Sequence, residues 1–147
     1  VKGQLFILET LSQYAAMMVL KEQYSEAKLL QFIENQSERY KEGKDREALE
    51  EPSLALVENQ DYVYYAKGAI NMYQFQKAIG EDNVNRALKR FLEDWNTSNG
   101  KRRITTNRYA TSQDLLGYFR EVTPSDQLHI IKELFESVGE LKTNQLH

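Results

Sequence analysis

LFILETLSQYAAMMVL, residues 5–20, is the longest apolar stretch of the sequence, and it predicts a helix from about Leu5 to Gln23. One charged residue, Glu9, stands in it where a hydrophobic side chain would be expected. On a helix, Glu9 shares one face with Leu5, Leu8, Ser12 and Ala16. We therefore expect its carboxylate to lie inside the protein or to line a cavity. A buried carboxylate needs a counter-ion, hydrogen bonds or a metal.

The rest of the sequence is also typical of helices. Only two prolines and seven glycines occur, and they fall between segments of 3.6-residue periodicity. A chain of 147 residues that is 41% hydrophobic can bury one core. We therefore predict an all-α fold of about six helices in a single domain, residues 1–147.

After residue 23 the sequence predicts a second helix, a surface loop, a short extended piece and a third helix. A second helix begins after Ser25, and the charged segment 38–52 forms a solvated helix end followed by a surface loop. A short extended piece covers Leu54–Val57. The helix after it ends at Gly80, which serves as its C-terminal cap. The apolar face of the second helix holds Leu29, Leu30, Phe32 and Ile33.

The later part of the sequence predicts three more helices and one loop. Residues 81–95 form an amphipathic helix, and residues 96–110 are a loop rich in turn residues. Thr111 or Ser112 caps the next helix, and the last one begins near Ser125. The core-facing residues of the 81–95 helix are Val84, Ala87, Leu88, Phe91, Leu92 and Trp95.

Composition excludes several classes of function. The 19 basic and 22 acidic residues are interspersed, so no field of one sign favours nucleic acid or an anionic membrane surface. Without cysteine the chain has no disulfide and no thiolate, and His, Asp and Glu remain as the strong metal ligands. The longest apolar run is shorter than the roughly 20 residues of a membrane span. We expect a soluble chain that does not insert into a membrane.

A second unusual stretch is DYVYYAKGAINMY, residues 61–73. It has three tyrosines in four residues, and a buried tyrosine hydroxyl needs a partner. Gly68 would cost a helix interior about 1 kcal/mol relative to alanine, which indicates close contact with a neighbouring element or a ligand. For a single tyrosine, aromatic packing is a commoner role than catalysis.

LETLSQY (residues 8–14) and YYAKGAINMY (residues 64–73), about fifty residues apart, together resemble the zinc aminopeptidases related to aminopeptidase N, the gluzincins of peptidase family M-one. Residues 80–95 and 110–124 are similar to later helices of the same catalytic domain. The resemblance covers nearly the whole chain and is specific in the order and spacing of its motifs. It implies the α-helical lobe of a peptidase that removes N-terminal residues from peptides.

The resemblance assigns roles to single residues. Glu9 matches the glutamate that is the third zinc ligand, following an HExxH helix that gives two histidines and the general base. Tyr65 matches the tyrosine of a Y-x-K-G pattern, which donates a hydrogen bond to the developing oxyanion. Tyr64 is the alternative if the alignment shifts by one residue. Lys67 and Gly68 complete the pattern and are interpreted as structural.

The sequence also departs from the family. Thr10 and Ser12 stand where many members have Gly and Ala, and the chain has no HExxH motif. Its two histidines, His129 and His147, are not spaced as zinc ligands. We expect zinc in a longer protein and none bound to this chain alone. Because the sequence opens at Val1 on an apolar run with no capping residue, we interpret it as a piece of such a protein.

Three partners follow from the resemblance: a peptide substrate, the missing N-terminal half of the catalytic domain, and a second copy in an artefactual dimer through an exposed apolar face. The spelling of residues 9–19 is similar to bacterial members attached to a membrane region like an ABC-transporter permease, although the sequence leaves localisation undetermined. Two alternatives stay open. One is a non-catalytic helical interaction or scaffold module, and the other is an ion pair between Glu9 and a core-facing lysine or arginine.

Overall fold

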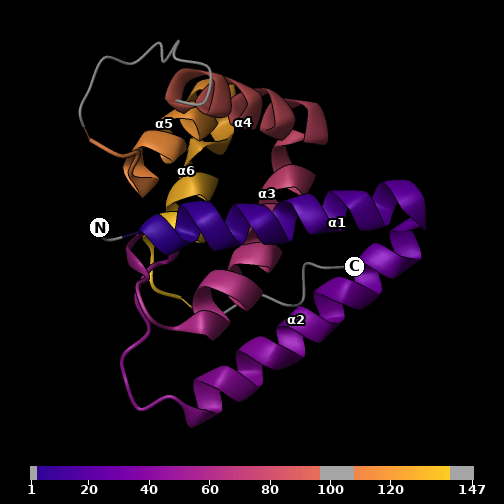
Figure 1. The fold of residues 1–147 in the computed structure, drawn as a ribbon, viewed down its shortest axis with the longest axis vertical. Coiled ribbons are helices and arrows are strands. Elements are labelled where there is room, and N and C mark those ends of the chain that lie inside the picture. Colours follow the sequence, from indigo (N-terminus) through magenta and orange to yellow (C-terminus); the bar gives the residue numbers. More distant parts are fainter. Residues whose placement is uncertain (1–2, 97–107, 140–147) are drawn as a thin grey trace.

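A computed structural model describes residues 3–96 and 108–139, and within these ranges every regular element is helical (Figure 1). The prediction of an all-α fold with about six helices is confirmed. The α-helices are α1 (Leu11–Gln23), α2 (Glu26–Arg46), α3 (Gly68–Ile79), α4 (Glu81–Trp95), α5 (Ser112–Val122) and α6 (Leu128–Ile131).

Five short elements complete the architecture. Three are π-helical turns, in which hydrogen bonds join residues five apart instead of four: η1 (Phe6–Thr10), η3 (Tyr62–Lys67) and η5 (Lys132–Glu136). Two are single 3-10 turns, η2 (Leu54–Leu56) and η4 (Ser125–Gln127). η1 runs directly into α1, and η3 runs directly into α3, so each pair forms one continuous helical rod.

The predicted helix ends are placed by local capping. The Ser25 side chain accepts a hydrogen bond from the backbone of Lys28, as an N-cap of α2 should. Gly80 adopts a φ of 92° where α3 gives way to α4, a conformation that glycine adopts at little cost. Thr111, one of the two candidates for the α5 cap, forms a reciprocal capping box with Asp114.

Helix α3 is the centre of the fold. It contacts α1, α2 and α4, and Figure 1 shows it crossing behind α1 while α1 and α2 form a hairpin at one side. Its side chains are buried around nearly its whole circumference, which is the pattern of a core helix. Helices α4 and α5 pack on each other and complete the other side of the bundle.

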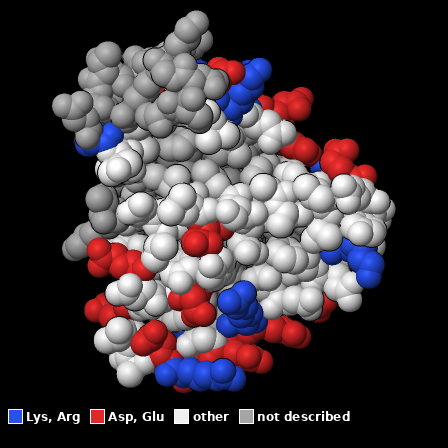
Figure 2. All heavy atoms as spheres, in the orientation of Figure 1, with Lys and Arg blue, Asp and Glu red and all other residues white. Residues whose placement is uncertain are grey.

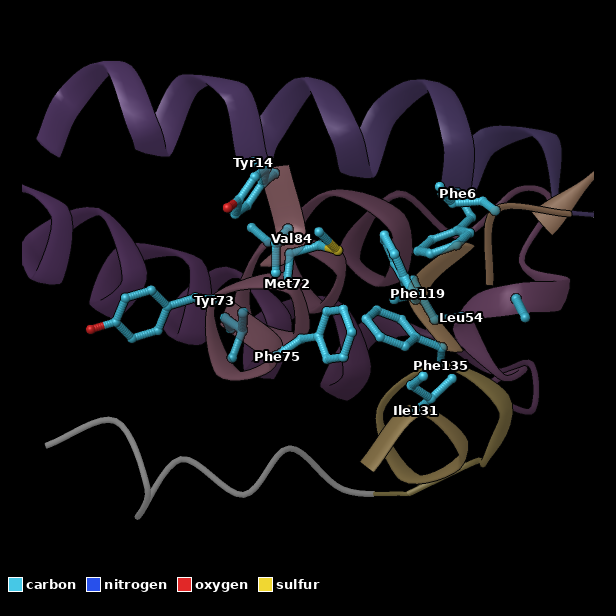
Figure 3. Close-up of a cluster of buried hydrophobic side chains, with 14 of the residues drawn as sticks. Phe6, Tyr14, Leu54, Met72, Tyr73, Phe75, Val84, Phe119, Ile131 and Phe135 are labelled. Atoms are coloured by element: carbon cyan, nitrogen blue, oxygen red, sulfur yellow. The ribbon is translucent and has the colours of Figure 1, made fainter. Parts of the chain in front are cut away.

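An aromatic cluster joins the first and last elements to α3. Phe135 of η5 lies 5.5 Å from the ring centre of Phe6, 5.5 Å from that of Phe75 and 5.7 Å from that of Phe119. All four rings are fully buried, and Figure 3 shows them meeting beneath α1. Burial of such rings stabilises the fold through both apolar area and ring-to-ring contact.

Several local predictions are wrong. Leu54–Val57 is not extended, because residues 54–56 form the 3-10 turn η2, which buries Leu54. Leu30 and Leu92 belong to the predicted apolar faces, yet they are 38% and 58% exposed at the edges of their helices. The charged segment 38–52 is a helix end as far as Arg46 and then leaves the helix, as predicted, but one of its later residues, Glu51, is buried instead of solvated.

Most of the predicted loop at 96–110 lies outside the described residues, as does His147. Among the helices that the structure describes, none is both long enough and apolar enough to cross a bilayer.

Candidate functional site

The spacing of residues predicted that Glu9 lies on the core-facing side of its helix. In the structure it does not. The buried stripe of η1 and α1 is instead formed by Phe6, Thr10, Tyr14 and Met17. Glu9 is partly buried, and its expected neighbours Ser12 and Ala16 are exposed. The four consecutive apolar residues at 5–8 offer a hydrophobic side chain in every direction, so the periodicity did not select the correct face. Glu9 is a boundary residue beside the core.

Both of the principal candidate residues lie on π-turns, Glu9 on η1 and Tyr65 on η3. The two turns pack against each other although they are far apart in the sequence. A hydrogen bond of 2.8 Å from the Thr10 hydroxyl to the Tyr64 carbonyl oxygen joins them directly. A π-turn within an α-helix is less stable than the regular helix, and such turns are frequent at functional sites.

The Glu9 carboxylate meets the Tyr65 hydroxyl where the turns face each other. The phenol donates a hydrogen bond to the carboxylate, which raises the pKa of Tyr65 above its ordinary value. Tyr64 also feels the charge of Glu9, but its ring packs on the core and lies 4.7 Å from that of Tyr65. The geometry therefore brings Glu9 together with Tyr65, the first of the two tyrosine candidates.

A cation also lies close to Tyr65. The guanidinium of Arg39, on α2, is 5.3 Å from the centre of the Tyr65 ring, within the range of a cation–π contact. Arg39 is also 3.8 Å from the Asp61 carboxylate. The sequence does not indicate this contact of Arg39, because Arg39 stands within a charged helical segment whose side chains are usually solvated.

Glu9 itself has no ion pair within residues 3–96 and 108–139. The ion pair with a core-facing lysine or arginine that spacing alone favoured is therefore absent from this part of the chain. A carboxylate that accepts one phenol hydrogen bond keeps further lone pairs for other donors or a cation.

Lys67 takes part in a separate, buried network. Its ammonium pairs with the Glu51 carboxylate and donates a hydrogen bond of 3.0 Å to the carbonyl oxygen of Gly139. The Tyr40 hydroxyl donates to the other oxygen of Glu51 at 2.6 Å. These bonds tie the segment after α2 to η3 and to the end of η5, which agrees with the structural role predicted for Lys67. Apart from its place in a charged run, nothing in the sequence around Glu51 indicates this role.

The described residues do not assemble a set of metal donors. No group of three or more His, Asp or Glu side chains in them is placed to hold a metal ion. His129 is exposed near the start of α6. Of the donors that a gluzincin site needs, the described residues include one candidate, Glu9.

A cleft of about 710 Å³ opens on the flank of η1. It contains neither Glu9 nor Tyr65, and its walls come from η1, from the end of α4 and from residues 108–110. Trp95 forms part of the wall, with the Arg108 guanidinium 5.1 Å from its ring centre. The apolar lining includes Ile7, Leu8, Phe91, Leu92 and Trp95.

The outer side of α1 is uncharged as far as Leu20. Residues 10–20 include no charged side chain, and Val19 of this helix is 51% exposed. Figure 2 shows a band without acidic or basic residues across the part of the molecule where α1 lies. Ser12, Ala15 and Ala16 make this surface small and mixed instead of strongly hydrophobic.

Comparison of this chain with protein-family models, with curated proteins and with solved structures finds no match.

Proposed function

We propose that this chain forms the helical part of the catalytic site of a zinc aminopeptidase, with Glu9 as a zinc ligand and Tyr65 as the donor that stabilises the oxyanion. The observation that carries the proposal is the meeting of the Glu9 carboxylate and the Tyr65 hydroxyl on two facing π-turns. The motif resemblance selected these two residues from segments about fifty residues apart, and it needs them to share one site.

The donor chemistry of Glu9 fits one position of a His2Glu zinc site. A carboxylate oxygen can approach zinc to about 2.0–2.2 Å, and Glu9 holds no competing cation among the described residues. Two histidines from an HExxH helix elsewhere in a longer protein would complete the set. When bound, the metal would supply Lewis-acid polarisation of the substrate carbonyl and an activated water.

Tyr65 would act by hydrogen bonding alone. Its phenol keeps its proton at neutral pH, because the ordinary tyrosine pKa is about 10 and the neighbouring carboxylate raises the pKa of Tyr65 further. A proton-bearing phenol can turn from Glu9 to a substrate oxygen as negative charge develops there. The Arg39 guanidinium over the ring would hold the side chain on the correct side of η3.

The alternative function is a helical interaction or scaffold module without catalysis. The uncharged outer side of α1 favours it, because an exposed helix face with few charges is suited to contact with another protein. In that case the Glu9 to Tyr65 hydrogen bond would only join two helices.

The experiment compares this chain with a version extended toward the N-terminus by about 150 residues, the span of a typical further domain. Zinc content and cleavage of an aminoacyl reporter are measured for both proteins. In the extended protein we expect Glu9→Gln to abolish zinc binding and activity. Tyr65→Phe should keep the zinc and lower kcat about a hundredfold to a thousandfold, the effect of losing one oxyanion donor.

Two matched controls make the result specific. Glu22→Gln removes an exposed carboxylate from the same helix, and Tyr64→Phe removes the neighbouring hydroxyl; both should leave zinc and kcat nearly unchanged. An extended protein without zinc and activity, or a Glu9→Gln variant that keeps both, would contradict the proposal and favour the scaffold module.

A further inference from the structure

Thr10 is a polar residue in an otherwise apolar stripe. It is fully buried, and it follows Phe6 and precedes Tyr14 on the core-facing side of η1 and α1. A buried hydroxyl is costly unless it forms a hydrogen bond. Thr10 meets this requirement through a residue of another element, because its hydroxyl donates a hydrogen bond of 2.8 Å to the carbonyl oxygen of Tyr64 on η3.

The π-turn η3 explains why this carbonyl can accept the bond. In an α-helix the N–H of residue 68 would bond to the carbonyl of residue 64. Here the Gly68 N–H bonds to the carbonyl oxygens of Val63 and Tyr65 instead. The Tyr64 carbonyl oxygen therefore does not receive its usual α-helical donor, and it accepts a hydrogen bond from the Thr10 hydroxyl.

Gly68 provides the space for this contact. A Cβ atom at position 68 would lie 2.4 Å from Oγ1 of Thr10 and 3.0 Å from its Cγ2. Real Cβ atoms do not approach other atoms this closely, so a side chain at position 68 would push Thr10 away from the carbonyl. Thr10 and Gly68 therefore form a matched pair, a hydroxyl and the socket that receives it.

We propose that Thr10 is a positioning residue for the Glu9–Tyr65 pair. Its hydroxyl, seated in the Gly68 socket, joins the residue after Glu9 to the residue before Tyr65, and so fixes the two π-turns at the separation at which carboxylate and phenol meet. The role concerns the same site, and its meaning for catalysis rests on the proposed function. The positioning itself does not require a metal.

Ser12, in the first turn of α1, forms a similar hydrogen bond to a carbonyl of η1. Its hydroxyl donates to the carbonyl oxygen of Leu8 at 2.7 Å, and the Leu11 N–H bonds to that carbonyl as well. Thr10 and Ser12 are the two positions at which the motif departs from small residues without hydroxyl groups. In this chain both hydroxyls serve the carbonyls of π-turns.

The test uses the protein labelled with 3-fluorotyrosine and reads the ¹⁹F signal of Tyr65 at neutral pH, with Tyr65→Phe to identify it among the nine tyrosines. Thr10→Val removes the hydroxyl and keeps the shape, whereas Thr10→Ser keeps the hydroxyl. We expect Thr10→Val to shift the Tyr65 signal in the same direction as Glu9→Gln does. Thr10→Ser should leave it near the wild-type position.

A double-variant cycle separates positioning from packing. If Thr10 acts by placing Tyr65 beside Glu9, Thr10→Val should shift the signal much less in a Glu9→Gln background than in the wild type. A Thr10→Val variant that is less stable but keeps the wild-type signal would overturn the proposal, as would an equal shift in both backgrounds. If Thr10→Val does not fold, Thr10→Ala decides by the same criteria, because it adds no methyl group against the socket.

The catalytic consequence is measured separately, in the extended protein. If the proposed function holds, Thr10→Val should lower kcat while zinc content and KM change little. Loss of the proposed function, seen as a zinc-free extended protein, would leave the ¹⁹F result standing. A failed ¹⁹F test with active, zinc-bound enzyme would reject only the role of Thr10.

Discussion

The Lys67 ammonium is buried against the Glu51 carboxylate, with only 4% and 8% of the two side chains exposed. Burial of two charges is costly, and their attraction offsets this cost only when further hydrogen bonds satisfy both groups. Here the Gly139 carbonyl and the Tyr40 hydroxyl provide those bonds. The pair therefore holds three separate segments of the chain together. Its removal should lower the free energy of unfolding.

Lys67→Met should lower the free energy of unfolding by about 3 to 5 kcal/mol, because it leaves Glu51 charged and buried without its main partner. Urea denaturation followed by circular dichroism measures the effect. Lys89→Met is the control, since Lys89 is 77% exposed and its pair with Glu93 should contribute about 0.5 kcal/mol or less. Equal losses for the two variants would show that the buried pair has no special weight.

Two helical glycines should respond to alanine in opposite ways. At Gly43 a Cβ atom would lie 2.3 Å from the Cβ of Tyr62, so Gly43→Ala should separate α2 from η3 and cost about 1 to 3 kcal/mol. At Gly117 nothing lies within 4 Å, so Gly117→Ala should stabilise α5 by up to about 1 kcal/mol. Thermal unfolding of the two variants tests this, and a change of the same sign in both would contradict the packing described at Gly43.

Phe135→Ala should be among the most destabilising substitutions and lower the free energy of unfolding by about 3 to 5 kcal/mol. The reason is that the Phe135 ring, on η5, contacts three buried rings of other elements. Leu92→Ala, at a position that sequence periodicity assigned to the core, should cost only about 0.5 kcal/mol, since Leu92 is 58% exposed. Chemical denaturation of both variants measures the difference. A larger loss at Leu92 than at Phe135 would reverse the assignment of the core.

The cap of α5 should make the free energy of unfolding depend on pH in the acidic range. The Arg108 guanidinium and, after it, the hydrogen bonds from Thr111 hold the pKa of Asp114 well below its ordinary value. A carboxyl with a lowered folded pKa stabilises the protein fully above its unfolded pKa, about 3.9, and this stabilisation is lost as the pH falls through the folded value. Asp114→Asn should therefore destabilise the protein at pH 7 and progressively less below about pH 4.

The measurement is the free energy of unfolding of wild type and Asp114→Asn between pH 7 and pH 2. The bonds from Thr111 to this carboxylate place the difference at about 1 kcal/mol at pH 7, in the range of one capping interaction. A difference that stays constant across the whole range would mean that the charge of Asp114 does not contribute.

The helix ends were predictable because their determinants are local. Ser25, Gly80 and Thr111 each act on residues within four positions of themselves, so the printed sequence contains the whole signal. Helix 81–95 was likewise predicted to the residue. Burial that depends on distant residues was not predictable in this way. The burial of Glu51 depends on Lys67, sixteen positions away, and nothing in the charged run around Glu51 indicates it.

The roles of the two candidate site residues stay predictions, and the geometry around them was not predicted from the sequence. The motif selected Glu9 and Tyr65, and the structure places the two side chains together. It also overturns the expectation that Glu9 faces inward, because Thr10 takes the core-facing position. The contact that joins the two π-turns connects residues 54 positions apart, and no helical periodicity reports such a pairing.

The π-turns have a consequence for how the chain can change in length. Each turn closes its hydrogen bonds over five residues, and so holds one residue more than the α-helical turn that it replaces. Loss of a single residue inside segment 62–67 could therefore be absorbed as an ordinary helical turn, with the flanking helix still facing the same way. The same deletion inside α3 would rotate every later side chain by about 100°. In this fold, insertions and deletions within helices are best tolerated where the candidate site lies.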